Sequence, residues 1–177
     1  MRRPVDADRV RAFMRALGRE ADRDGRAYLT GGSTAVLLGW RESTIDIDLK
    51  LEPESDRLLR AIAELKERLD LNLELASPDQ FIPEIAGWRE RSLWIAREGR
   101  LDFHHFEIAM QALAKIERGH AQDREDVAQM LARGLVTASE LALRFAEIEP
   151  LLYRFPAIDP VSFRRAVEAV TREGANR

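Results

Sequence analysis

The amino-acid sequence predicts an α+β fold, in which a small mixed β-sheet carries packed helices and is followed by a helical C-terminal part. Two kinds of apolar periodicity support this prediction. Residues 45–51 and 71–76 alternate apolar and polar side chains, which is typical of half-buried strands. Residues 6–24 and 54–69 instead repeat apolar side chains at helical spacing. Helices that alternate with strands in this way indicate a sheet with helices packed on it.

The first part of the chain alternates short helices and strands. Gly25 and Gly39 lie where the first two helices are expected to end, because glycine is common just after a helix. The expected elements are a helix over residues 6–24, a strand over 26–30, a short helix over 33–38, a strand over 45–51, a helix over 54–69 and a strand over 71–76.

The second part begins with a predicted hairpin and continues as helices. Residues 92–96 and 101–106 flank a loop that contains Gly99, so we expect two antiparallel strands here. Helices are expected over residues 107–117, 122–131, 139–148 and 161–172. The sequence therefore predicts a core over residues 1–106 and a helical part over residues 107–177 that packs on this core.

Composition excludes several classes of function. The 177 residues include no cysteine, so disulfides, thiolate metal sites and cysteine nucleophiles are excluded. The net charge is −3, so no overall basic field indicates nucleic acid as a partner. No apolar run approaches the roughly 20 residues that span a bilayer, and the start lacks a secretory signal. We expect a cytoplasmic protein without a membrane partner.

Two aspartates on one predicted strand are the first candidate site residues. Side chains two positions apart on a strand point to the same face, so Asp46 and Asp48 can converge on one cation while Ile47 enters the core. Mg²⁺ binds through one or two carboxylates together with substrate phosphates, and Mn²⁺ accepts similar ligands. Glu74, on the next alternating strand, is expected to face the same side and to serve as a third metal ligand.

The second half of the candidate site is the stretch Gly31-Gly32-Ser33, which precedes a predicted helix. Glycine lets the backbone approach a phosphate closely, and a helix start offers unpaired N–H groups. The Ser33 hydroxyl can donate a further hydrogen bond. We therefore expect a triphosphate to lie between this turn and a metal ion at Asp46 and Asp48.

This combination of motifs resembles the signature of the nucleotidyltransferase superfamily. Gly31-Gly32-Ser33 is followed after twelve residues by Asp46-Ile47-Asp48, and Glu74 lies between two leucines on a later strand. The resemblance implies a polymerase-beta-like nucleotidyltransferase core, with Asp46, Asp48 and Glu74 as catalytic metal ligands and Gly31, Gly32 and Ser33 binding the nucleotide. The chain is most similar to the small bacterial group that includes the AbiEii-like nucleotidyltransferase toxins of toxin–antitoxin systems.

A later basic and acidic stretch also resembles these relatives. Lys115 and Arg118 lie on one predicted helix, and Asp123 and Asp126 follow them. The resemblance implies that Lys115 reaches the nucleotide phosphates and that Asp123 or Asp126 orients it.

Simpler interpretations remain open for several residues. Asp46 and Asp48 are also compatible with the solvated face of an edge strand that Lys50 continues. His104 and His105 are adjacent on a strand and so face opposite sides, which separates them as metal ligands. Trp88 fits either a structural role or a rim that stacks on a base. The sequence does not assign a role to His104, His105 or Trp88.

The resemblance implies a metal-dependent enzyme that moves an NMP from an NTP to a hydroxyl acceptor. The acceptor is left open between RNA, protein and a small molecule. One alternative is a toxin that acts beside an antitoxin protein. The others are a small-molecule, antibiotic-type nucleotidyltransferase and a nucleotide-binding module without turnover.

Overall fold

The structure is a computed structural model that describes residues 3–175. The chain forms two compact units. The first comprises the chain up to Ser77 together with Ser92–Phe106, and the second comprises Pro78–Arg91 together with the chain from Glu107 onward. Each unit is considered by itself below.

The first unit is built on a five-stranded mixed sheet with the strand order β3-β2-β1-β5-β4. The neighbours β1 and β2 are antiparallel, as are β4 and β5, whereas β1 and β5, and β2 and β3, are parallel. The strands are β1 (Gly25–Thr30), β2 (Asp46–Glu52), β3 (Asn72–Glu74), β4 (Leu93–Glu98) and β5 (Leu101–His105). The predicted α+β fold with a small mixed sheet is confirmed.

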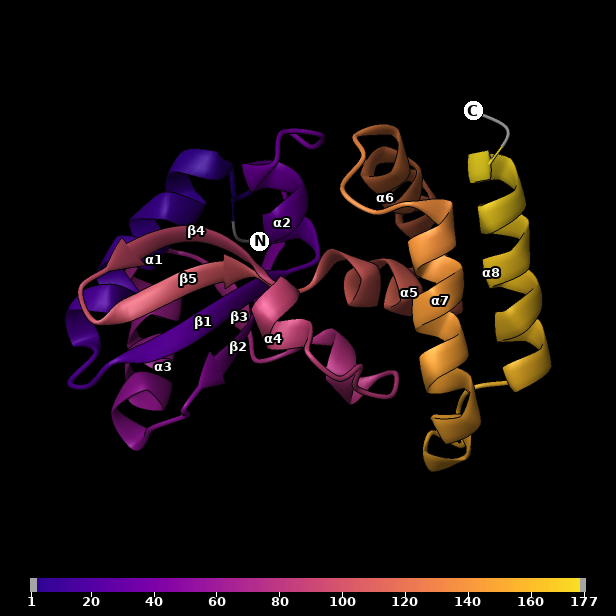
Figure 1. The fold of residues 1–177 in the computed structure, drawn as a ribbon. Helices are drawn as coiled ribbons and strands as arrows, with labels where there is room; N and C mark the ends of the chain where they lie inside the picture. Colours follow the sequence, from indigo (N-terminus) through magenta and orange to yellow (C-terminus); the bar gives the residue numbers. More distant parts are fainter. Residues whose placement is uncertain (1–2, 176–177) are drawn as a thin grey trace. The chain divides into compact units, whose positions relative to one another are not determined.

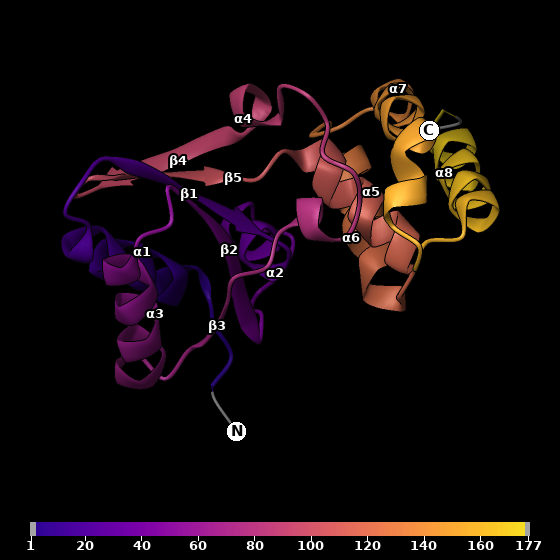
Figure 2. The ribbon, with the colours of Figure 1, turned by 90° about the horizontal axis from the view of Figure 1, so that it is seen from below.

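Two helices cover one face of this sheet. Figures 1 and 2 show α1 (Ala7–Glu20) and α3 (Asp56–Arg68) on the same side of the strands. Both helices begin at a capping side chain, because the Asp6 carboxylate accepts from the Arg9 N–H and the Ser55 hydroxyl accepts from the Leu58 N–H. Their apolar stripes and the inward side chains of the strands form one core. The opposite face of the sheet therefore carries the polar side chains.

Short segments connect these elements and position the glycine turn. The helix α2 (Gly32–Leu37) begins directly after β1 and Gly31.

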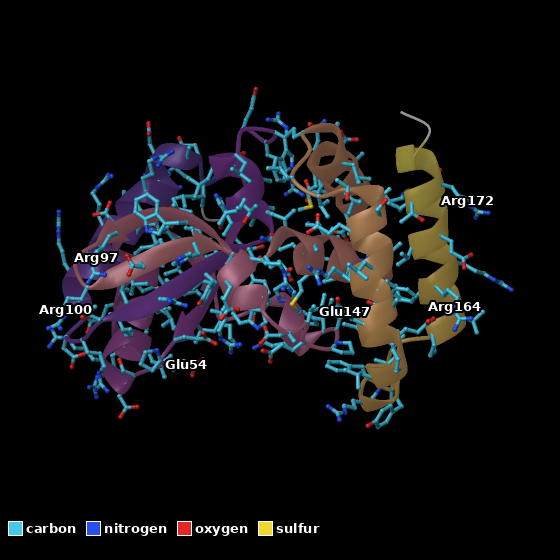
Figure 3. All side chains as sticks on the ribbon, viewed as in Figure 1. Glu54, Arg97, Arg100, Glu147, Arg164 and Arg172 are labelled. Carbon is cyan, nitrogen blue, oxygen red and sulfur yellow. The ribbon has the colours of Figure 1, made fainter. Side chains whose placement is uncertain are left out.

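At the far end of the sheet, Arg97 and Arg100 both form ion pairs with Asp24, at 3.0 and 3.1 Å. Figure 3 shows the two arginines at the turn between β4 and β5. These exposed pairs tie the hairpin to the segment before β1 and contribute little stability.

The second unit is helical. Its longer helices are α5 (Ile108–Arg118), α6 (Ala121–Ala132), α7 (Ala138–Ile148) and α8 (Pro160–Ala175), and its shorter ones are η1 (Pro78–Gln80), α4 (Trp88–Arg91) and η2 (Glu149–Arg154). The rings of Phe145 and Phe163 pack edge to face with centroids 4.9 Å apart and join α7 to α8. Trp88 is fully buried, and its indole N–H donates to the Glu84 carboxylate at 2.7 Å, which is a structural role.

Three details differ from the sequence-based expectations. The strand over residues 45–51 was expected to include Ile45 as an inward apolar side chain, but Ile45 precedes β2 and is 72% exposed. The third strand is shorter than predicted, and Leu75 lies beyond its end. The segment Pro78–Arg91, which was assigned to the core, groups with the helices of the second unit. How the helical part packs on the core stays a prediction. No helix in the described part of the chain is long and apolar enough to span a membrane.

Candidate active site

The two candidate aspartates lie on the polar face of the sheet. Burial alternates along β2, with Ile47 and Leu49 fully buried and Asp46 and Asp48 half-buried. This alternation follows from the period of two in a strand. Both carboxylates therefore face the same side, where a cation from solvent can reach them.

Strand pairing brings Glu74 to the same face. In the parallel pair of β2 and β3, Asp48 lies opposite Glu74 and Asp46 lies opposite Asn72. Paired residues on adjacent strands are about 4.8 Å apart in the hydrogen-bonding direction and point to the same side. The Asn72 amide donates to the Asp46 carboxylate. Asp46, Asp48, Asn72 and Glu74 thus form one polar group.

The glycine turn lies directly against this group. Gly31 has φ 61° and ψ −128°, a backbone conformation that residues with a Cβ atom rarely adopt. A Cβ atom placed on Gly31 would lie 3.0 Å from an oxygen of Asp48. A Cβ atom on Gly32 would lie 2.0 Å from the Thr44 hydroxyl, so no side chain fits there either. Gly31 lets the turn approach the Asp48 carboxylate, and Gly32 lets it pack against Thr44.

The Ser33 hydroxyl is able to form a further hydrogen bond. Ser33 is fully buried, and its Oγ atom has no hydrogen-bond partner among the described residues. A buried hydroxyl without a partner is costly and uncommon. A hydroxyl at the start of α2, two residues after Gly31, fits a role in binding a phosphate oxygen.

The carboxylates fit a hard divalent cation as a pair. Oxygen ligands suit Mg²⁺ and Mn²⁺, and Mg²⁺ often uses only one or two protein carboxylates, with phosphates and water completing its shell. Within residues 3–175, no group of three or more His, Asp or Glu side chains could by itself hold a metal ion. The role of Glu74 as a third ligand stays a prediction.

A histidine that the sequence left unassigned supports the glycine turn. His105 is buried on the core side of β5, and its Nδ1 atom lies 3.1 Å from the Thr34 hydroxyl, next to Ser33. Burial, with the nearby charge of Arg11, lowers the pKa of His105 to about 4, so the imidazole is neutral at pH 7. His104 faces the opposite side, half-buried, and burial lowers its pKa too. The prediction that the two histidines point apart is confirmed.

Lys115 belongs to the second unit and is engaged there. Its ammonium group is buried and donates to Asp123 at 3.2 Å and to Asp126 at 2.6 Å. Arg118 also binds Asp123 through two nitrogens. Burial alone would raise the pKa of Asp123, but the hydrogen bond from Arg118 and the charge of Lys115 lower it to about 2. A contact between Lys115 and a nucleotide stays a prediction.

Sequence reasoning missed several residues around the turn. Asn72 had a visible signal, because it alternates with Glu74 on the same strand. Thr44 and Thr34 had no such signal in the sequence. Thr44 contacts Gly32 and Thr34 contacts His105, and both contacts join residues that are distant in the chain.

A glycine turn against a strand with two aspartates, on a mixed five-stranded sheet, is the arrangement expected of a nucleotidyltransferase. A family model described as "Nucleotidyltransferase of unknown function (DUF6036)" matches residues 8–161, and the chain belongs to this family. One solved structure, an antigenic nucleotidyltransferase-like protein from Paracoccidioides brasiliensis, is similar with a TM-score of 0.50 at 15% identity. The match covers 94% of this chain and 95% of that one and supports the fold. No curated protein matches the sequence.

The protein is therefore a nucleotidyltransferase by family, and its family implies an NTP substrate. The similarity to AbiEii-like toxins, the metal ion and the acceptor stay predictions.

Proposed function

We propose that the protein transfers an NMP from a metal-bound NTP to a hydroxyl acceptor at the polar face of the sheet. The observation that carries this proposal is the contact of the Gly31 turn with Asp48. In this arrangement a phosphate-binding turn and a cation-binding carboxylate lie side by side. A triphosphate with its divalent cation needs both.

Each residue of the proposed site has a defined task. Asp46 and Asp48 would hold Mg²⁺ or Mn²⁺, which offsets phosphate charge and orients the triphosphate when bound. The Gly32 backbone and the Ser33 hydroxyl would bind phosphate oxygens. Glu74 would accept the proton of the acceptor hydroxyl or contribute a further ligand. The acceptor oxygen forms a bond to the α-phosphorus, and the bond from that phosphorus to the pyrophosphate oxygen breaks.

The role of Lys115 follows from its surroundings in the second unit. Asp123 and Asp126 hold its ammonium group, so a nucleotide phosphate would have to take the place of one of these carboxylates to bind it. We propose that it acts on the nucleotide phosphates by charge.

The proposal predicts transfer of label from an α-³²P-NTP, in the presence of Mg²⁺ or Mn²⁺, to RNA, to protein in a cell extract, or to small hydroxylated compounds. The Asp46→Asn/Asp48→Asn double variant should lose this transfer and keep its unfolding temperature. Absence of both transfer and metal-dependent NTP binding in the unaltered protein would contradict the proposal. A separate test expresses the protein in cells with and without the product of an adjacent gene. If the protein alone stops growth and the adjacent product restores it, the two form a toxin–antitoxin pair.

A further inference from the structure

We propose that the helical unit contains a second binding site, for a small molecule with a planar apolar body and an acidic group. The site is a cavity of about 330 Å³ between α6 and the C-terminal half of α8. Its floor is formed by α5, through Lys115 and Ile116. Volumes of this order, with mainly apolar walls and a few polar groups, are typical of small-ligand sites. Apart from Lys115, the residues that line this cavity have no role in the proposed transfer reaction.

The two helices present matching faces of small side chains to the cavity. On α6 the wall includes Ala128 and Ala132, one turn apart, and on α8 it includes Ala166 and Ala169, which are also about one turn apart. Larger apolar side chains, such as Leu131 of α6, complete the walls. Ala128 and Ala166 are partly buried, whereas Ala132 and Ala169 are exposed, so the chain does not fill this gap and its mouth opens to solvent.

The gap is bounded at both ends and is not a loosely packed helix end. The first half of α8 is anchored, because Phe163 packs on Phe145 of α7 and Val167 is buried. At the other end, a Cβ atom on Gly174 would lie 3.6 Å from the Leu131 side chain and 3.4 Å from Ala138. α8 therefore contacts its neighbours on either side of the cavity.

The outer face of α8 carries charged side chains. Figure 3 shows Arg164 and Arg172 on the side of α8 that points away from α7. Arg164 and Arg172 thus point into solvent, whereas Ala166 and Ala169 line the cavity. This division separates a solvated face from a face suited to an apolar ligand.

The form of the walls favours a planar ligand. Alanine side chains are short, so the walls that they form offer few obstructions to a flat ring. A ring system also loses little conformational entropy when it binds, unlike a flexible chain of equal volume.

One cation in the lining is positioned for an acidic group. Arg124 of α6 donates from Nη1 to the carbonyl oxygen of Gly119 at 2.8 Å, which holds its side chain at the cavity. Its Nε and Nη2 atoms carry further donors, and guanidinium groups bind carboxylates and sulfonates well. Lys115 is not the partner, because Asp123 and Asp126 hold its ammonium group. Glu173 of α8 also lines the cavity and would repel an anion, so the acidic group should lie on the α6 side.

The probe for this site is 1-anilinonaphthalene-8-sulfonate, which combines aromatic rings with a sulfonate. The unaltered protein should bind one probe per chain with saturable fluorescence enhancement. Ala166→Phe, which fills the cavity, should weaken binding at least tenfold. The matched control Ala142→Phe, on the exposed face of α7 and outside the cavity lining, should leave the affinity unchanged. Ala128→Leu fills the cavity from α6 and gives the same test if Ala166→Phe fails to fold.

Two further variants test whether the ligand carries an acidic group that binds Arg124. Arg124→Gln should weaken binding about fivefold or more, and Glu173→Gln should leave it unchanged or strengthen it. Absence of saturable binding, several probes per chain, or equal affinity in folded Ala166→Phe and Ala128→Leu would overturn the site. Weaker binding in Glu173→Gln with no change in Arg124→Gln would overturn the acidic ligand.

Discussion

The two units each contain a pair of aspartates, and the pairs have opposite surroundings. Asp46 and Asp48 lie half-buried on a strand, two residues apart, on a face of the sheet that solvent reaches. Asp123 and Asp126 lie three residues apart on α6, are almost fully buried, and are neutralised by Lys115 with help from Arg118. In the proposed function the first pair accepts a cation from outside, whereas the second already has its cations within the chain.

This difference separates function from stability. Carboxylates that repel one another at a surface cost stability until a cation binds, so their removal should affect chemistry and leave folding intact. Buried ion pairs behave in the opposite way, because loss of one partner leaves an uncompensated charge in a medium of low polarity. The predictions below use this contrast.

The largest expected effect is on activity at the first pair. Asp48→Asn should lower the transfer rate by about a thousandfold, since metal binding supplies several kcal/mol and each 1.4 kcal/mol corresponds to a factor of ten. Its unfolding temperature should stay constant or rise. Label transfer and thermal unfolding measure the two quantities. Glu52→Gln, farther along the same strand and face, is the control and should retain activity. Equal losses of activity and stability in Asp48→Asn would contradict the account.

The second pair should show the reverse pattern. Lys115→Met leaves Asp123 and Asp126 buried without their main cation and should lower the free energy of unfolding by about 3–5 kcal/mol. Urea denaturation measures this change. Lys115→Met/Asp126→Leu should recover part of the loss, because one uncompensated charge is removed. A single variant as stable as the unaltered protein would show that the ion pairs are not a structural element.

A smaller effect is expected from the pH dependence of the first unit. The pKa of His105 is lowered to about 4 by burial, so the unfolded chain binds more protons than the folded one between about pH 6.5 and 4. This contribution to stability is complete above pH 6.5 and is lost as the pH falls toward 4, by up to about 3 kcal/mol. His105→Asn can keep a hydrogen bond to Thr34 and should lack this loss. Urea denaturation at pH 7, 5.5 and 4.5 compares the two proteins, and identical pH profiles would be inconsistent with a buried neutral histidine.

The smallest effect tests the geometry of the glycine turn. Gly32→Ala places a Cβ atom against the Thr44 hydroxyl and should cost about 1–3 kcal/mol, the usual range for overpacking. Thr44→Ala removes the hydroxyl at 2.0 Å but keeps the Thr44 Cβ atom at 2.6 Å, so Gly32→Ala/Thr44→Ala should recover only part of this stability. Additive losses in the double variant, measured by thermal unfolding, would show that the contact does not limit position 32.

Much of the fold and the candidate site could be predicted from local patterns. The alternation of β2 places Asp46 and Asp48 on one face, and the same period places Asn72 and Glu74 on one face of β3. The sequence could not give the register that sets Glu74 beside Asp48, because strand pairing is decided by contacts between distant residues.

Three features lay outside any local pattern. The His105–Thr34 contact and the Gly32–Thr44 contact depend on tertiary packing, as does the absence of a partner for Ser33 among the described residues. Lys115 is a different case. The sequence indicated its proximity to Asp123 and Asp126, but it could not show that the ammonium group is buried between them.

The most direct test of the central claim is calorimetric titration of a nonhydrolysable NTP analogue, with and without Mg²⁺, into the unaltered protein and into Asp46→Asn/Asp48→Asn. The account predicts binding that requires Mg²⁺ in the unaltered protein and is lost in the double variant, while both proteins unfold at similar temperatures. Binding of equal strength in both proteins, or binding that is indifferent to Mg²⁺, would contradict it.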